Sequence, residues 1–232
     1  MGKEKDPRHE HRKRMREALM NAQRDDELPD YQLLEMLLFY ALPRIDTRVI
    51  AHNIMEHCNN SLAEVFDASP QKLAQVKGVS ENFAVILKLV LTCARRYSIK
   101  KAEKSIFNGA GDIGKFLIEQ YISEDLETLS MISLNSSGKF LGFNIISRGK
   151  PDSVTVSART IVECAIKNSA HSVILAHNHP SGIAIPSKAD ADTTRQIKKI
   201  LEPLGVHLID HIVLDKQDFV SMAQSAEFAD IF

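Results

Sequence analysis

A strand-length apolar run that ends in two histidines and a sharp turn constrains this sequence more than any other feature. Residues 172–176 are followed by His177, Asn178 and His179, and a proline and a glycine then end the strand. Successive strand side chains alternate between faces, so His177 and His179 share one face. A helix opens after a second proline, and Asp190 lies in its first turn. Two imidazoles and one carboxylate can therefore converge where the strand gives way to the helix.

Imidazole and carboxylate groups suit a divalent metal, and zinc in particular. Three protein ligands leave a coordination position for water, which is typical of catalytic zinc sites, where the pKa of the bound water falls to about 7. A structural interpretation is also open, because Ser187 and Asp190 have the spacing of a helix-capping pair and the histidines can simply end a strand. Both halves together at this spacing favour a zinc site formed by His177, His179 and Asp190.

The pattern also resembles a known motif. His177-x-His179, followed by seven residues, Ser187, two residues and Asp190, is similar at every position to the JAMM (MPN+/JAB) metalloprotease motif. This resemblance implies that His177, His179 and Asp190 bind zinc. It further implies a catalytic part for Ser187, which would help to hold the tetrahedral oxyanion, and a peptide or protein as substrate.

Two further segments resemble the bacterial RadC family. They are the His-Asn-His-Pro-Ser-Gly stretch at residues 177–182 and the pair Asp210-His211, and a weaker resemblance covers nearly the whole chain. The resemblance implies an α/β, mixed-sheet MPN domain, JAB-like and cytidine-deaminase-like, behind an all-helical domain. Relatives in this family carry a DNA-repair label, which says little about chemistry.

One residue of the expected machinery differs. JAMM enzymes use a glutamate from an earlier strand as general base, and in RadC relatives it lies a few residues before a glycine that we align with Gly149. This alignment puts Asn144 at the glutamate position, and residues 128–151 contain no aspartate or glutamate. Asparagine can orient a water molecule but cannot accept its proton. Glu163, on the following helix, is another carboxylate, and only its proximity to the site favours it as the general base.

The missing carboxylate leaves two functions open. The first is zinc-dependent hydrolysis of peptide or isopeptide bonds, weakened by the loss of general-base help that is typically worth about 10²–10⁴-fold. The second is a metal-holding, largely non-catalytic module of the RadC family that associates with DNA or with a protein partner.

Domain organisation follows from the periodicity of the chain. The apolar pattern predicts a helical domain with a linker over residues 1–104 and the metal-binding α/β domain over residues 105–232. Residues 98–111, with several lysines and two glycines, predict the linker itself. The helices expected before the linker cover residues 31–40, 47–55, 62–66, 70–76 and 81–97. The elements expected after it are helices at 112–121, 157–167 and 187–204 and strands at 128–134, 139–147, 172–178, 206–214 and 219–222.

A turn in the helical domain resembles a helix-hairpin-helix. Lys77-Gly78-Val79-Ser80 precedes a long helix, where a Gly-apolar-Gly turn would present backbone N–H groups to a nucleic-acid phosphate. Ser80 replaces the second glycine, which keeps a helix cap but not the close approach that glycine permits. Weak, non-specific DNA binding through Gly78 and a plain helix connector both remain open.

Composition limits the remaining classes. The 29 Lys and Arg nearly balance the 30 Asp and Glu, so only a local patch can support nucleic-acid binding. The charged residues 3–16 read either as a basic arm for phosphates or as a solvated helix end. No apolar run reaches membrane length, and Cys58, Cys93 and Cys164 lie far apart, which suits a reducing cytoplasm.

Overall fold

The computed structural model describes residues 7–24, 26–103, 105–149, 154–180 and 182–232. The chain divides into two compact units, Met1–Cys93 and Ala94–Phe232, which are considered separately below. Sequence expectations for residues 3–6, for the linker residue 104 and for residue 181 of the histidine turn lie outside the described residues. The predicted domain boundary at residues 104 and 105 remains a prediction.

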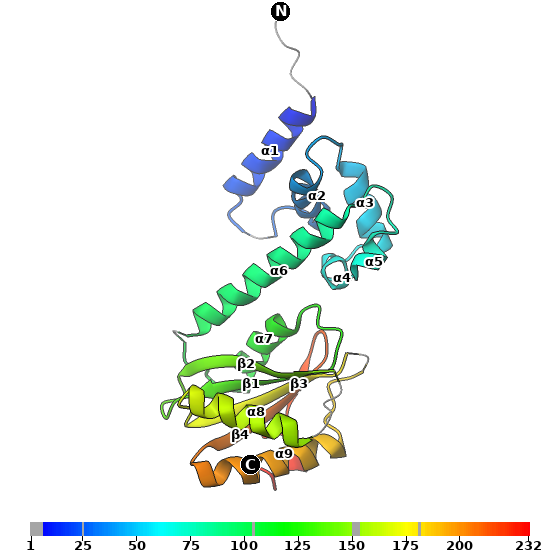
Figure 1. The fold of residues 1–232 in the computed structure, drawn as a ribbon. Helices are drawn as coiled ribbons and strands as arrows, with labels where there is room; N and C mark the ends of the chain where they lie inside the picture. The colour runs from blue at the N-terminus through cyan, green and yellow to red at the C-terminus, as the bar shows by residue number, and fades with distance from the viewer. Residues whose placement is uncertain (1–6, 25, 104, 150–153, 181) are drawn as a thin grey trace, which may run out of the picture. The chain divides into compact units, whose positions relative to one another are not determined.

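The first unit is built from helices around a core of leucine, isoleucine and phenylalanine side chains (Figure 1). Leu34, Leu38, Ile54 and Phe83 are fully buried there, so the helices predicted for this part of the chain pack their apolar side chains into a common core. The helices are α1 (Pro7–Asn21), α2 (Asp30–Ala41), α3 (Arg48–His57), α4 (Leu62–Asp67), α5 (Pro70–Leu73) and α6 (Glu81–Ala102), which begins in this unit.

The long helix α6 corrects one expectation. It continues to Ala102, whereas the sequence predicted a linker from residue 98. Lysine has a high helix propensity, so Lys100 and Lys101 continue the helix and do not form the expected linker. Ile99 and Ala102 pack against the core of the second unit, which adds a tertiary reason for these turns to stay helical.

The second unit contains a five-stranded mixed sheet in the order β2-β1-β3-β4-β5 (Figure 1). Strands β3 and β4 pair in parallel, and the other neighbours are antiparallel. The α/β prediction, with a helical part followed by a mixed sheet, is therefore confirmed. The strands are β1 (Thr128–Leu134), β2 (Phe140–Arg148), β3 (Ser172–Asn178), β4 (His207–Leu214) and β5 (Phe219–Ser221). The helices are α7 (Ala110–Tyr121), α8 (Val154–Lys167), α9 (Lys188–Leu201), η1 (Glu202–Leu204) and η2 (Ala226–Phe228).

Helices cover both faces of this sheet, and strand β3 shows which face each side chain meets. Ile174 and Ala176 belong to the core shared with α7, while Val173 and Leu175 belong to the core shared with α8 and α9. Because strand side chains alternate, His177 faces the same side as Val173 and Leu175. The fold thus directs His177 toward helix α9, which follows β3 in the chain. Across the described residues, no helix combines the length and apolarity that a bilayer crossing requires.

Candidate metal centre

The centre forms where buried strand β3 passes into helix α9. All seven residues of β3 are buried, as expected for the central strand of a sheet covered on both faces. Pairing with β4 continues one residue past the strand, since the His179 backbone N–H donates to the Leu214 carbonyl at 2.8 Å. The next secondary-structure element, α9, begins at Lys188. The parallel connection from β3 through α9 to β4 therefore brings the strand end and the helix start together.

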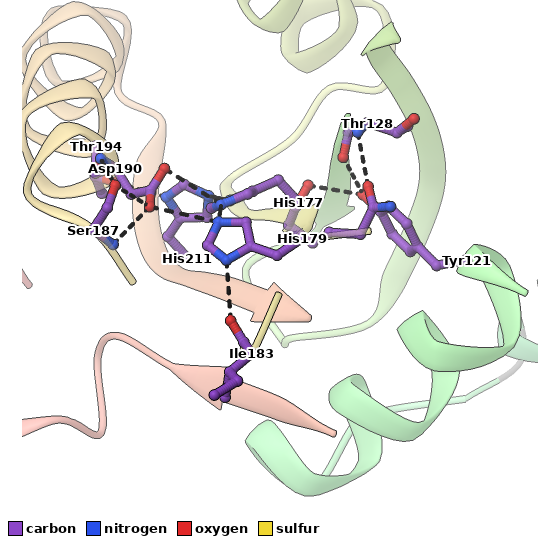
Figure 2. A network of polar contacts seen from close by, with 11 residues as sticks. Tyr121, Thr128, His177, His179, Ile183, Ser187, Asp190, Thr194 and His211 are labelled. Carbon is purple, nitrogen blue, oxygen red and sulfur yellow. Dashed lines mark hydrogen bonds and ion pairs between the residues drawn. The ribbon is translucent and has the colours of Figure 1, made fainter. Parts of the chain in front are cut away.

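Three side chains converge at this point, as the sequence predicted. His177 Nε2 lies 3.0 Å from His179 Nε2 and 3.3 Å from Asp190 Oδ1 (Figure 2). His179 Nε2 lies 3.9 Å from Asp190 Oδ2. In the described part of the chain, these residues are the group of histidine, cysteine and acidic side chains that offers ligand atoms within 4.8 Å of one another.

Two of these three separations fit a tetrahedral zinc ion. Bonds of about 2.0–2.1 Å to nitrogen and oxygen place two tetrahedral ligands about 3.3 Å apart. The 3.0 and 3.3 Å separations lie close to that value, and the 3.9 Å between His179 and Asp190 is longer. Two neutral imidazoles and one carboxylate also match the donor types that zinc accepts, and they leave one position for a water molecule or a substrate.

Ser187 holds Asp190 in place. The Ser187 hydroxyl and backbone N–H both donate to Asp190 Oδ2, at 2.6 and 2.7 Å, and the Asp190 N–H donates back to Ser187 Oγ at 3.2 Å. This is a capping box at the start of α9, so the capping interpretation of the sequence is correct. It does not exclude the metal site, because Oδ2 takes the hydrogen bonds and Oδ1 faces His177.

The imidazole of His179 is oriented from its other nitrogen. His179 Nδ1 lies 3.2 Å from the carbonyl of Ile183, in the turn between β3 and α9 (Figure 2). A carbonyl oxygen can only accept a hydrogen bond, so His179 carries its hydrogen on Nδ1 and leaves a lone pair on Nε2. A backbone carbonyl behind a ligating histidine is a common support of metal sites.

Burial keeps His177 neutral at physiological pH. The side chain is almost inaccessible, and this desolvation lowers the pKa of His177 to about 4, although the charge of Asp190 acts to raise it. Burial acts to raise the pKa of Asp190, but His177 and the two hydrogen bonds from Ser187 outweigh it, so that pKa is lowered. The resting pair is therefore a neutral imidazole and a carboxylate, the protonation states that a metal needs.

Asn144 is not brought to the three ligands. In the register of the sheet, His177 pairs with Leu129, whose partner on β2 is Ser147, whereas Asn144 pairs with Met131. The Asn144 side chain accepts a hydrogen bond from Asn168 Nδ2 at 2.8 Å instead. Its amide is thus committed to a partner just beyond helix α8. The sequence alignment put Asn144 beside the ligands, and the strand register does not.

Glu163, the other carboxylate considered from sequence, faces solvent on helix α8. Its Oε1 lies 2.8 Å from Arg159 Nε, and 61 % of its side chain is exposed. This is an ordinary i, i+4 ion pair on a helix surface, a type worth about 0.3–0.5 kcal/mol. The arrangement gives Glu163 a structural partner and adds nothing to its claim as general base.

Sequence reasoning gave no role to two residues behind the ligands. On β4, His211 Nε2 lies 2.9 Å from His177 Nδ1. On α9, Thr194 Oγ1 lies 2.6 Å from His211 Nδ1 (Figure 2). Burial lowers the pKa of His211 to about 3. The available signals were weak: Thr194 stands one helical turn after Asp190, and His211 interrupts an apolar strand.

A second network fixes the strands next to the centre. The side chain of Asn178 accepts from the Thr128 N–H at 2.7 Å and donates to the carbonyls of Glu124 and Leu126. The Tyr121 hydroxyl lies 2.8 Å from the Ala176 carbonyl. These contacts tie the segment from Tyr121 to Thr128, which leads into β1, to the end of β3 that carries His177.

An α/β sheet with a His-x-His pair at a strand end and an aspartate in the following helix defines a protein of the JAB type. A family described as the RadC-like JAB domain matches residues 107–227, more than half of the chain. UPF0758 protein FN0909 of Fusobacterium nucleatum subsp. nucleatum is 35% identical over 222 residues, which cover 92% of this chain and 95% of that protein. The chain therefore belongs to the RadC-like JAB domain family.

Proposed function

We propose that the second unit is a zinc-dependent hydrolase of peptide or isopeptide bonds. The observation that carries the proposal is the convergence of three side chains: His177 Nε2 lies 3.0 Å from His179 Nε2 and 3.3 Å from Asp190 Oδ1, and His179 Nε2 lies 3.9 Å from Asp190 Oδ2. Three ligand atoms with a fourth position left open is the pattern of a catalytic metal site, since structural zinc sites use four protein ligands. The three cysteines are free thiols, which fits action in a reducing cytoplasm.

When bound, zinc supplies a Lewis acid for the scissile carbonyl and lowers the pKa of a water molecule to about 7. The residues of the chain then have separate tasks. His177, His179 and Asp190 would hold the ion. Ser187 donates to Asp190 Oδ2, which fixes the orientation of that carboxylate. We further propose that the Ser187 hydroxyl turns toward the oxyanion in the reaction, which requires it to give up its bond to Asp190.

Matched variants of helix α9 test the hydrolase proposal. Asp190→Ala removes a ligand, and Asp192→Ala removes a carboxylate from the same helix that pairs with Arg195 and does not reach the centre. Zinc-loaded protein is assayed on a peptide library and on isopeptide-linked substrates. We expect turnover by the wild type and by Asp192→Ala, abolished in Asp190→Ala and by a chelator. Turnover that survives in Asp190→Ala would contradict the proposal.

A metal-holding module without turnover is the second candidate. Two observations favour it: residues 128–151 contain no carboxylate, and the amide of Asn144 is held by Asn168. Zinc-loaded wild type that binds metal but cleaves neither substrate class would favour this alternative. Asn144→Glu belongs in the same assay, because a gain would show that a carboxylate there reaches the reaction in spite of the register.

DNA is a proposed partner of the helical unit. Gly78 has φ of +94°, and a Cβ at this position would meet Ile50 Cδ1 at 3.0 Å, so the turn before α6 needs glycine. The exposed Lys77 beside this tight turn supports weak binding to a phosphate that ignores base sequence.

A further inference from the structure

A chain of polar contacts connects two of the ligands through residues that do not reach the metal position. His177 Nδ1 lies 2.9 Å from His211 Nε2, and His211 Nδ1 lies 2.6 Å from Thr194 Oγ1. The Thr194 hydroxyl in turn donates to the backbone carbonyl of Asp190 at 2.5 Å (Figure 2). The path therefore starts at one ligand and ends at the backbone of another, and we call it the histidine–threonine relay.

The direction of every hydrogen bond in the relay follows from its last member. The Asp190 carbonyl can only accept, so the single hydroxyl hydrogen of Thr194 points toward it. Thr194 Oγ1 must then accept at its other contact, which puts the imidazole hydrogen of His211 on Nδ1. A neutral imidazole carries one N–H, so His211 Nε2 holds a lone pair.

The lone pair of His211 determines the tautomer of His177. Because His211 Nε2 accepts, His177 must donate from Nδ1, and its own lone pair is left on Nε2. Both side chains are buried, His177 at 4% and His211 at 2% exposure, and burial favours the neutral form of an imidazole. Both ligand histidines thus present bare Nε2 atoms to the same point, His177 through the relay and His179 through the Ile183 carbonyl.

We propose that His211 and Thr194 are positioning residues that lock His177 in the Nδ1–H tautomer and so prepare the centre for its metal before the metal arrives. The hydrogen bond at one imidazole nitrogen decides which nitrogen is free for the metal. Without the relay, His177 can place its hydrogen on Nε2, where it blocks the ligand position. The proposal rests on the proposed metal centre and not on hydrolysis, so the two fail in different experiments.

The tautomer can be measured directly in metal-free protein. Nitrogen-15 NMR of imidazole-labelled wild type, after dialysis against a chelator at pH 7.5, separates Nδ1–H from Nε2–H histidines. We expect His177 and His211 both to carry hydrogen on Nδ1. A His177 found in the Nε2–H form would overturn the proposal without any variant.

Two matched pairs of variants test the relay through zinc affinity, measured by competition with a chelating dye. In His211→Gln, the amide oxygen lies at about the distance of Nε2 from the backbone and can still accept from His177. In His211→Asn, the amide reaches only as far as Nδ1, so the acceptor for His177 is lost. Thr194→Ser keeps the hydroxyl, whereas Thr194→Val removes it from a side chain of similar shape. We expect a 10–100-fold loss of affinity in His211→Asn and Thr194→Val, as is typical for outer-shell partners, and a smaller loss in the other two.

The outcomes separate tautomer control from general damage. Circular dichroism and thermal unfolding first establish which variants are folded. In folded His211→Asn, weaker zinc binding together with appearance of the Nε2–H form of His177 supports the proposal. Wild-type affinity in both His211→Asn and Thr194→Val would overturn it, as would equal losses within each matched pair, because a purely structural role does not distinguish the partners of a pair.

Discussion

Each unit of this protein places a carboxylate beside a histidine with one partner of the pair buried, and the two arrangements are opposite in character. In the helical unit, Glu35 is 1% exposed, and its Oε1 lies 2.9 Å from His11 Nε2. Arg48 reaches the other imidazole nitrogen at 3.2 Å. Arg48 can donate to Nδ1 while Nε2–H donates to Glu35, so each acceptor in this cluster faces a donor. In the metal centre, His177 Nε2 faces another bare nitrogen and a carboxylate oxygen.

The difference shows how a ligand site is told from a structural polar cluster. Buried polar groups are normally satisfied, and an acceptor that faces another acceptor costs free energy. The Glu35 cluster is complete as it stands, so nothing further is needed to explain it. In the candidate metal centre, the proposed tautomers turn three acceptors toward one another, and a cation between them would satisfy all three. Four experiments test this comparison, from the largest expected effect to the smallest.

Zinc should stabilise the second unit strongly. A ligand at a thousandfold excess over its dissociation constant adds about 4 kcal/mol to the free energy of unfolding. We therefore expect a higher melting temperature for wild type with zinc than with chelator, and no difference for the His177→Ala/His179→Ala double variant. Calorimetry and metal analysis of protein purified without a polyhistidine tag make the comparison. A double variant that retains an equivalent of metal would contradict the assignment of the ligands.

Acid should destabilise the metal-free protein through His177. Its pKa is about 4 in the folded state and about 6.5 when unfolded, so the unfolded chain takes up the proton first as pH falls. The stabilisation is present above pH 6.5 and is lost progressively toward pH 4, by roughly 3 kcal/mol. Urea unfolding at several pH values in the presence of chelator measures this loss. His177→Gln should show a flatter dependence, and an unchanged slope in that variant would assign the effect to other groups.

Removal of Glu35 should destabilise the helical unit and leave metal binding alone. Glu35→Ala leaves the His11 Nε2–H without its acceptor, at a cost of about 1–3 kcal/mol. Glu56→Ala, an exposed carboxylate on α3, serves as the matched control and should change stability by less than about 0.5 kcal/mol. Urea unfolding gives the first result and dye competition the second. Weaker zinc binding in Glu35→Ala would break the distinction between the two clusters.

The convergence of the three side chains was predictable from sequence because it depends on local structure. A strand end, a tight turn and the first helical turn are short-range features, and they fix His177, His179 and Asp190 within fourteen residues of chain. The role of His211 was not predictable, because it depends on the register of the parallel pair β3 and β4, where His211 stands beside Leu175.

The error over Asn144 has the same origin. Strands β1 and β2 pair with register shifts between Leu129 and Ser130 and between Ser133 and Leu134. Such irregularities change which residues stand opposite each other, and a count along the sequence does not detect them. The linker error had a different cause: lysines near residue 100 looked like a solvated connection, but apolar contacts of the neighbouring turns kept them in helix α6.

The smallest expected effect concerns DNA and the turn at Gly78, where the helical unit would bind a ligand by exposed backbone rather than by buried acceptors. Lys77 is exposed next to this turn, and Lys77→Glu should weaken binding to duplex DNA a few-fold and reduce the slope of log K against log salt by about 1. Lys88→Glu makes the same charge change at an exposed position farther along α6. Fluorescence anisotropy at several salt concentrations measures both variants.

A loss confined to Lys77→Glu supports phosphate binding at the turn, because a general change in charge would act equally from Lys88. Equal losses, or none, would make the turn a plain connector between α5 and α6, and the metal centre would then be the ligand site for which the chain offers physical grounds.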